Sequence, residues 1–199
     1  MLLPSRYQDA FSRNALPPLA LWPELAFDLP GLRFPDLLNC ADELLLTGTA
    51  IAGDDALAIV SDREALTYAE LNGRVNRIAR VLRDDCGLQS GERVLLRGSN
   101  TPGLLAAWLA VVKAGGIAVT TMPMLRAGEL GKIIAIARPR LALCEQALAG
   151  ELRPCLGAAG FERIVEYGGA DAELEQLAGT KSPEFPAFPA SQDDVCLIA

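Results

Sequence analysis

The sequence contains no histidine among its 199 residues. This absence excludes Ser-His-Asp and Cys-His nucleophile systems, and any metal site with an imidazole ligand, from this chain. Glycine-rich phosphate-binding motifs are absent as well. No G-x-G-x-x-G follows a predicted strand, and AGELGKII (127–134) lacks both the spacing and the Ser or Thr of a P-loop. We therefore assign Lys132 in that stretch to a solvated helix face.

Long apolar runs are also absent. The longest, LLAAWLAVV (104–112), ends at Lys113, whereas a membrane span needs about 20 apolar residues. No basic segment leads into an apolar run near the start, so no secretory signal is predicted. The net charge of −7 repels a phosphate backbone. We expect a cytoplasmic protein with neither a nucleic acid nor a membrane as partner.

The sequence contains cysteines, but their number and spacing do not predict a set of structural disulfides. The odd count of five and the absence of any C-x-x-C pair argue against structural disulfides. The cysteines are interpreted as small buried apolar residues in a reducing compartment. They are Cys40, Cys86, Cys144, Cys155 and Cys196.

From residue 93 onward, apolar segments alternate with helical patterns. This order predicts an α/β fold in which βαβ units build a parallel sheet. The helix at 102–114 is apolar nearly all round and should be covered on both sides. The expected strands are 93–98, 117–121, 141–144 and 163–167, and the expected helices are 102–114, 127–137, 147–158 and 171–178.

The segments before residue 93 contain clear local signals. Six prolines predict an irregular arm over 1–35, and Asp36–Leu46 reads as a helix with Leu37, Leu38, Ala41 and Leu44 on one side. A hairpin is expected to turn at Asp62–Glu64, and Thr67 with Glu70 forms a capping box. The following helix should bury Leu71, Val75, Ile78 and Leu82 and present a polar face of Asn72, Arg74, Asn76, Arg80 and Arg83.

The sequence divides into four segments. Residues 1–53 form the arm and first helix, 54–178 a βαβ subdomain, and 179–194 a Pro-rich linker. Residues 195–199 (VCLIA) read as the start of a buried strand, and we expect this strand to lead into further sequence after Ala199.

Three motifs occur in an order that resembles the adenylate-forming superfamily of AMP-dependent synthetases and ligases. LTYAEL (66–71) looks like the first core motif of that family, and VVKAGGIAVTTMP (111–123) looks like the second. GLQSGERVLL (87–96) resembles the turn into the first strand of its sheet. RNALPPLALWPEL (13–25), RFPDLLNCADELLL (33–46) and TTMPMLRAGEL (120–130) look most like the aryl-CoA ligases for benzoate and 2-aminobenzoate.

The resemblance implies the N-terminal subdomain of an AMP-forming acid–CoA ligase. Such enzymes use ATP and Mg²⁺ to convert a carboxylic acid, here an aromatic one, to an acyl-adenylate, and then transfer the acyl group to CoA. The phosphate loop would follow Ala199, so this chain would be inactive and would hold none of these ligands tightly. No catalytic residue is carried over.

Arg126 is the one candidate cofactor-binding residue. It follows the Met-Pro-Met-Leu turn, where some CoA ligases place basic residues toward the CoA nucleotide. Part of the family has a basic residue directly after the proline, where this chain has Met124. The alternative interpretation of Arg126 is a surface arginine at the start of a helix.

Two other functions remain open at this stage. An adenylation enzyme that loads a carrier-protein thiol would share this half of the sequence. A self-contained doubly wound binding or regulatory module would carry a site at the carboxyl ends of its strands, where no acidic cluster or glycine-rich loop occurs. For a ligase subdomain, exposed apolar surface is expected to promote self-association.

Overall fold

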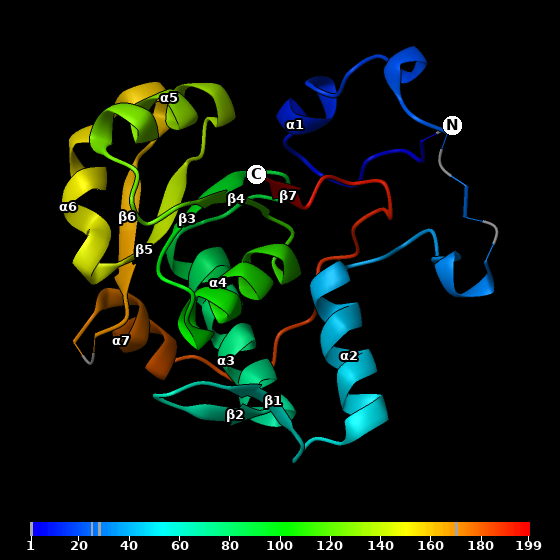
Figure 1. Ribbon diagram of the computed structural model, residues 1–199, viewed down its shortest axis with the longest axis horizontal. Coiled ribbons are helices and arrows are strands. Elements are labelled where there is room, and N and C mark those ends of the chain that lie inside the picture. Colours follow the sequence, from blue (N-terminus) through cyan, green and yellow to red (C-terminus); the bar gives the residue numbers. More distant parts are fainter. Residues whose placement is uncertain (1, 25, 28, 170) are drawn as a thin grey trace.

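The computed structural model describes residues 2–24, 26–27, 29–169 and 171–199. Its centre is a five-stranded sheet with the order β6-β5-β3-β4-β7, and all neighbouring strands run parallel (Figure 1). The strands are β3 (Arg93–Arg97), β4 (Ile117–Thr121), β5 (Leu141–Glu145), β6 (Arg163–Tyr167) and β7 (Leu197–Ile198). The predicted α/β fold with a parallel sheet is confirmed.

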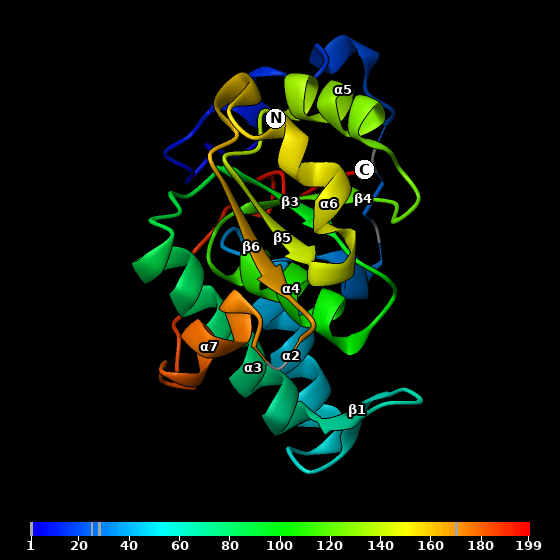
Figure 2. The same ribbon diagram turned by 90° about the vertical axis from the view of Figure 1, so that its left-hand side faces the viewer.

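Helices cover both faces of this sheet (Figure 2). One face packs against α5 (Ala127–Ala137) and α6 (Ala149–Leu152), and the other faces α3 (Tyr68–Arg80) and α4 (Pro102–Lys113). Successive side chains of β3 point to opposite faces of the sheet. Leu95 therefore packs in the core under α5 and α6, while Val94 and Leu96 pack in the core under α3 and α4. Every residue of β3 is buried, as expected for a central parallel strand.

Helix α4 lies between the sheet and a second helical layer. It packs against β3 and β4 on one side and against α3 and α2 (Cys40–Ala52) on the other. Thr101 caps its start by accepting a hydrogen bond from the backbone N–H of Leu104, and Pro102 occupies the first turn. The expectation that this apolar helix is covered on two sides is confirmed.

The hairpin and the first long surface helix follow the sequence signals closely. Strands β1 (Leu57–Val60) and β2 (Ala65–Thr67) pair antiparallel, and the predicted capping box of Thr67 and Glu70 is present at the start of α3. All four predicted core residues of α3 and its extension are buried. Asn76 is a correction: it is buried, because its amide donates to the carbonyl of Pro183 in the C-terminal segment.

The arm is mostly irregular, with α1 (Phe11–Asn14) and two short 3₁₀ turns (Leu19–Leu21 and Pro30–Leu32). The predicted helix Asp36–Leu46 is wrong in its bounds, because α2 begins at Cys40. Leu37 and its neighbours instead pair with the Ala190–Gln192 backbone, and Leu37 and Leu44 are exposed. Asn39 stops this extended segment by capping α2 through the N–H of Asp42.

Two further expectations need correction. The predicted helix 147–158 is interrupted: a 3₁₀ turn (Gln146–Leu148), the single turn α6 and a second 3₁₀ turn (Arg153–Cys155) succeed one another, because Pro154 cannot continue a helix. The terminal strand 195–199 is reduced to β7, a half-exposed edge strand rather than a buried one. It has β4 as its neighbour on one side only.

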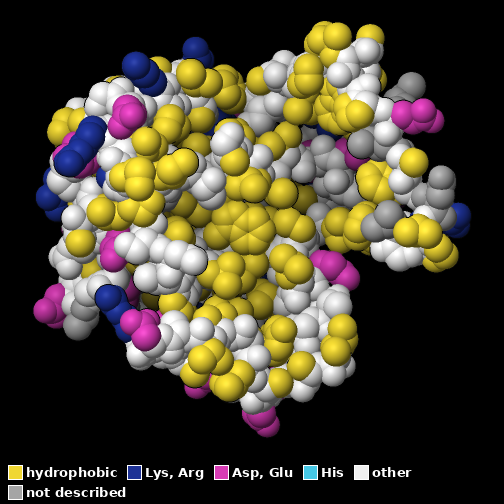
Figure 3. All heavy atoms as spheres, in the orientation of Figure 1, with side chains coloured by type: hydrophobic (Ala, Val, Ile, Leu, Met, Phe, Trp, Pro, Cys, Tyr) yellow, Lys and Arg dark blue, Asp and Glu magenta, His cyan; other side chains and the backbone are white. Residues whose placement is uncertain are grey.

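The remaining elements complete the α/β layer. A π-helical turn (Val81–Asp85) extends α3, a further 3₁₀ turn (Ala158–Gly160) precedes β6, and α7 (Glu173–Gly179) packs on β6 and α3. Apolar side chains gather on the face that carries α4 and the C-terminal end (Figure 3).

In the described part of the chain no helix is long and apolar enough to cross a membrane.

Candidate functional site

The carboxyl ends of three neighbouring strands meet at one edge of the sheet, and this edge is the candidate site. β3 ends at Arg97, β4 at Thr121 and β5 at Glu145. In open parallel sheets ligands bind outside the carboxyl ends of the strands. The carboxylate of Glu145 accepts a hydrogen bond from the backbone N–H of Ser99 at 2.7 Å, which joins the loops that follow β5 and β3.

A buried arginine organises this edge. The Arg97 side chain donates to the carbonyl oxygens of Met122, Pro123 and Leu125 at 3.0, 2.9 and 2.8 Å, and its Nε donates to Leu148 at 3.2 Å. The residue is only 1% exposed. Since buried charge requires hydrogen bonds to offset lost hydration, the four carbonyls both stabilise the guanidinium and are fixed by it. Arg97 therefore fixes the segment 122–125 that leads to Arg126.

Arg126 lies at the end of that segment, directly before α5. Its Nη1 donates to Oε1 of Glu151 at 2.8 Å, and Oε2 of Glu151 accepts from the backbone N–H of Ala127 at 3.0 Å. The hydrogen bond from Arg126 is the main reason that the pKa of Glu151 is lowered. The arginine side chain is 78% exposed, so it is accessible to a ligand, and its contact with a CoA phosphate stays a prediction. Lys132 is exposed on α5, as expected.

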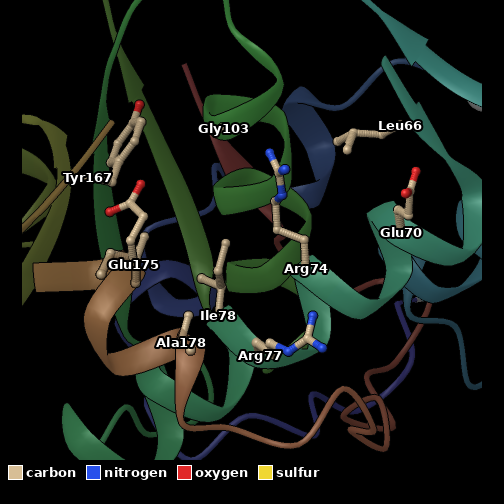
Figure 4. A pocket seen from close by; sticks show the side chains of 11 residues that line it. Leu66, Glu70, Arg74, Arg77, Ile78, Gly103, Tyr167, Glu175 and Ala178 are labelled. Atoms are coloured by element: carbon tan, nitrogen blue, oxygen red, sulfur yellow. The ribbon is translucent and has the colours of Figure 1, made fainter. Parts of the chain in front are cut away.

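A cavity lies on the face of the sheet that carries α3 and α4, between α3, α7, the end of β6 and the start of α4 (Figure 4). Its volume is about 630 Å³. Apolar groups and four charged side chains line it together, and Arg126 is not among them. The lining residues are Leu66, Glu70, Arg74, Arg77, Ile78, Gly103, Tyr167, Leu174, Glu175, Ala178 and Gly179.

Several of the charged groups of this cavity are engaged by the protein itself. Arg74 forms an ion pair with Glu64 through two hydrogen bonds, from Nη1 to Oε1 at 2.9 Å and from Nη2 to Oε2 at 2.7 Å. This ion pair lowers the pKa of Glu64. Glu70 serves the capping box, and Glu175 accepts from the N–H of Gly168. Burial raises the pKa of Tyr167 well above its ordinary value, so this wall is neutral at physiological pH. The lining of the cavity thus combines apolar side chains with two acidic and two basic residues, which balance in charge.

The structure offers no metal centre within the residues it describes. No three His, Cys, Asp or Glu side chains converge where an ion could be held. All five cysteines are free thiols. Cys86, Cys144 and Cys155 are buried as expected, while Cys40 and Cys196 are half-buried beside a small cavity.

Sequence reasoning missed two features of the chain. Arg97 stands out only as a charged residue in an otherwise apolar strand, and its carbonyl partners lie 25 to 51 positions away. Cys40 and Cys196 are separated by most of the chain, so no local spacing indicates that they meet. A charged residue inside a predicted central strand is the one signal that could have identified the first.

The sequence of this chain is similar to those of known enzymes. The profile of the AMP-binding enzymes matches residues 49–199, which include the hairpin, α3 and the whole sheet. The salicyl-AMP ligase / salicyl-S-ArCP synthetase of Mycobacterium tuberculosis is 32% identical over 170 residues, which are 80% of this chain and 27% of the relative. This family match agrees with the resemblance inferred from the motifs.

Solved structures give the same result. A benzoate CoA ligase from Burkholderia xenovorans LB400 superposes with a TM-score of 0.72 at 26% identity, over 81% of this chain and 32% of that structure. An anthranilate CoA ligase in complex with anthranoyl-AMP gives a TM-score of 0.73 at 20% identity, over 82% of this chain and 32% of that one, and this likeness concerns the fold. The chain therefore spans about a third or less of the length of each of these three proteins.

Proposed function

Since the chain belongs to the family of AMP-binding enzymes, we propose that it forms the N-terminal subdomain of an AMP-forming ligase for an aromatic carboxylic acid. The parent enzyme converts the acid and ATP to an acyl-adenylate and pyrophosphate, and then transfers the acyl group to the thiol of CoA with release of AMP. The observation that carries this proposal is the family match across the parallel sheet, from residue 49 to residue 199. The likeness to a benzoate CoA ligase supports the aromatic substrate and CoA.

The chemistry of this reaction depends on positioned groups that stabilise charge on the transferring phosphoryl and acyl groups. We assign no such group to this chain, and no residue of it to Mg²⁺. The chain contributes the sheet, the edge organised by Arg97 and the segment before α5. In this proposal the loop that holds the ATP phosphates follows β7, and the 199-residue chain alone is inactive.

The proposal is tested on the protein encoded by the whole gene. Purified protein is incubated with ATP, Mg²⁺, CoA and benzoate or 2-aminobenzoate, and thioester and AMP are quantified by chromatography. Equal amounts of aryl-CoA and AMP are expected. Formation of neither product with any of a panel of aromatic acids would contradict the proposal.

A carrier-protein thiol is the second candidate acceptor. The M. tuberculosis relative is named as a salicyl-S-ArCP synthetase, and it matches 80% of this chain. Replacing CoA by a phosphopantetheinylated aryl carrier protein in the same assay separates the two acceptors. Thioester on the carrier protein alone would favour the second candidate.

Arg126 is the proposed contact of this chain with CoA. Arg126→Ala is expected to raise the Michaelis constant for CoA several-fold in the parent enzyme and to leave acyl-adenylate formation unchanged, because the exposed guanidinium would neutralise a nucleotide phosphate. Arg153→Ala removes another exposed arginine that pairs with a glutamate and serves as the matched control. An unchanged Michaelis constant in Arg126→Ala would refute this role.

A further inference from the structure

Four remote segments of the chain meet at a small cavity beside β7. The arm contributes Tyr7, α4 contributes Val112, the start of α2 and the residues before it contribute 38–40, and the C-terminal segment contributes Ala190 to Gln192, Asp194 and Cys196. Backbone hydrogen bonds fix the last two segments against each other, from Leu38 N–H to Ala190 and from Gln192 N–H to Asp36. The cavity has a volume of about 50 Å³, enough for a molecule of the size of water or peroxide.

Two cysteines line this cavity. Cys40 is the first residue of α2, and Cys196 precedes β7, where its carbonyl accepts from the N–H of Ala118. Both are half-buried, whereas the other three cysteines are buried. These two cysteines are therefore less buried than the other three.

The two thiols differ in their readiness to ionise. The neighbouring Cys40 thiol, as a potential donor to the Cys196 sulfur, lowers the pKa of Cys196 below that of an ordinary thiol. The same contact and burial raise the pKa of Cys40, so Cys40 stays protonated. The other titratable groups at the cavity are Tyr7 and Asp194, and burial keeps the Tyr7 phenol neutral by raising its pKa. A thiolate next to a thiol is the arrangement that favours disulfide formation.

We propose that Cys40 and Cys196 form an oxidisable pair, which hydrogen peroxide converts to an intramolecular disulfide. The Cys196 thiolate attacks one peroxide oxygen, the O–O bond breaks, and the leaving hydroxide takes up a proton to become water. The Cys40 sulfur then attacks the sulfur of the Cys196 sulfenic acid. The S–S bond forms, the S–O bond breaks, and the hydroxide leaves as a second water with the Cys40 proton. Two thiols and one peroxide thus give one disulfide and two waters.

This site does not depend on the proposed ligase activity. The link would join the start of α2 to the residue before β7, so it would brace the arm and the edge of the sheet against each other. A low-molecular-weight thiol would reverse it by exchange.

The 199-residue chain itself allows a direct test. Native protein is treated with hydrogen peroxide, free thiols are blocked with N-ethylmaleimide, and tryptic peptides are analysed by mass spectrometry. Cleavage after Arg33, Arg63 and Lys181 places Cys40 in peptide 34–63 and Cys196 in peptide 182–199, each with a single cysteine. The expected product is these two peptides joined, with the loss of two hydrogens, while Cys86, Cys144 and Cys155 carry maleimide. Recovery of Cys40 and Cys196 as maleimide adducts after peroxide treatment would overturn the proposal.

Variants test the order of attack. In Cys40→Ser, peroxide should leave a sulfenic acid on Cys196 that dimedone captures. In Cys196→Ser, dimedone labelling of Cys40 is expected to be at least tenfold lower. Cys155→Ser, the matched control, should cross-link like the original chain. Equal labelling of Cys40 and Cys196, or loss of the cross-link in Cys155→Ser, would contradict the assignment.

Discussion

At the scale of single residues, the least predictable feature is the set of buried cations. Arg93, Arg97 and Lys113 are all almost completely buried. Lys113 pairs with Asp42 and also donates to Asn72, so it links α4 to α2 and α3. The sequence places these residues in a strand or at a helix end, but apart from the Gly91 carbonyl, which accepts from Arg93, their partners lie 25 or more positions away. Composition and periodicity contain no information on such partners, which only the packed structure brings together.

Arg97 gives the sharpest stability prediction at this scale. Arg97→Met is expected to lower the free energy of unfolding by about 3 kcal/mol or more, because several buried carbonyls lose their donor. Urea denaturation followed by circular dichroism measures the change. Arg63→Met, at the exposed hairpin turn, is the control and should stay within about 0.5 kcal/mol. Equal stability of the two variants would show that Arg97 does not organise the sheet edge.

At the scale of elements, prediction succeeded where the signal lies within the element. The capping box of α3, the Thr-Pro start of α4 and the hairpin turn involve only neighbouring residues, and all are present. The predicted start of α2 was wrong, because the position of Asn39 depends on remote residues. Its amide also donates to the carbonyls of Val112 and Phe188. The predicted length of the terminal strand was wrong for a related reason, because in the described structure this strand pairs with β4 alone.

A pair of threonines tests the role of local capping. Thr67→Ala is expected to lower the free energy of unfolding by about 1 kcal/mol, because the N–H of Glu70 loses its acceptor at the start of α3. Thr47→Ala lies inside α2, where the hydroxyl contacts only the exposed Glu43 carboxylate, and alanine favours the helix. Chemical denaturation should therefore show no loss for Thr47→Ala. Equal losses at both sites would contradict the assigned capping box.

At the scale of the whole molecule, the sequence predicts the parallel α/β layer but not its surfaces. Together with general rules on βαβ connections, the alternation of strands and helices predicts a parallel sheet with right-handed crossovers, but it does not give the strand order β6-β5-β3-β4-β7. The positions of the large cavity and of the thiol pair depend instead on how the arm, α7 and the C-terminal segment fold back on that layer. Exposed apolar side chains such as Leu105, Met122 and Met124 remain on the surface.

This surface is expected to promote self-association of the 199-residue chain. Light scattering should give an average mass that rises with protein concentration, because contiguous exposed apolar area favours contact between copies. Leu105→Lys places a charge on α4 and should reduce the effect, whereas Ile136→Lys, on α5 across the sheet, is the control. A constant monomer mass at high concentration would contradict self-association through these exposed apolar side chains.

The central claim, that this α/β layer is the first part of an acid-activating enzyme, is tested most directly by isotopic ATP–pyrophosphate exchange. The 199-residue chain and the protein encoded by the whole gene are compared with benzoate or 2-aminobenzoate as the acid. We expect acid-dependent exchange by the longer protein and none by the chain alone. Exchange by the chain alone, or its absence from the longer protein with every aromatic acid tried, would contradict the account.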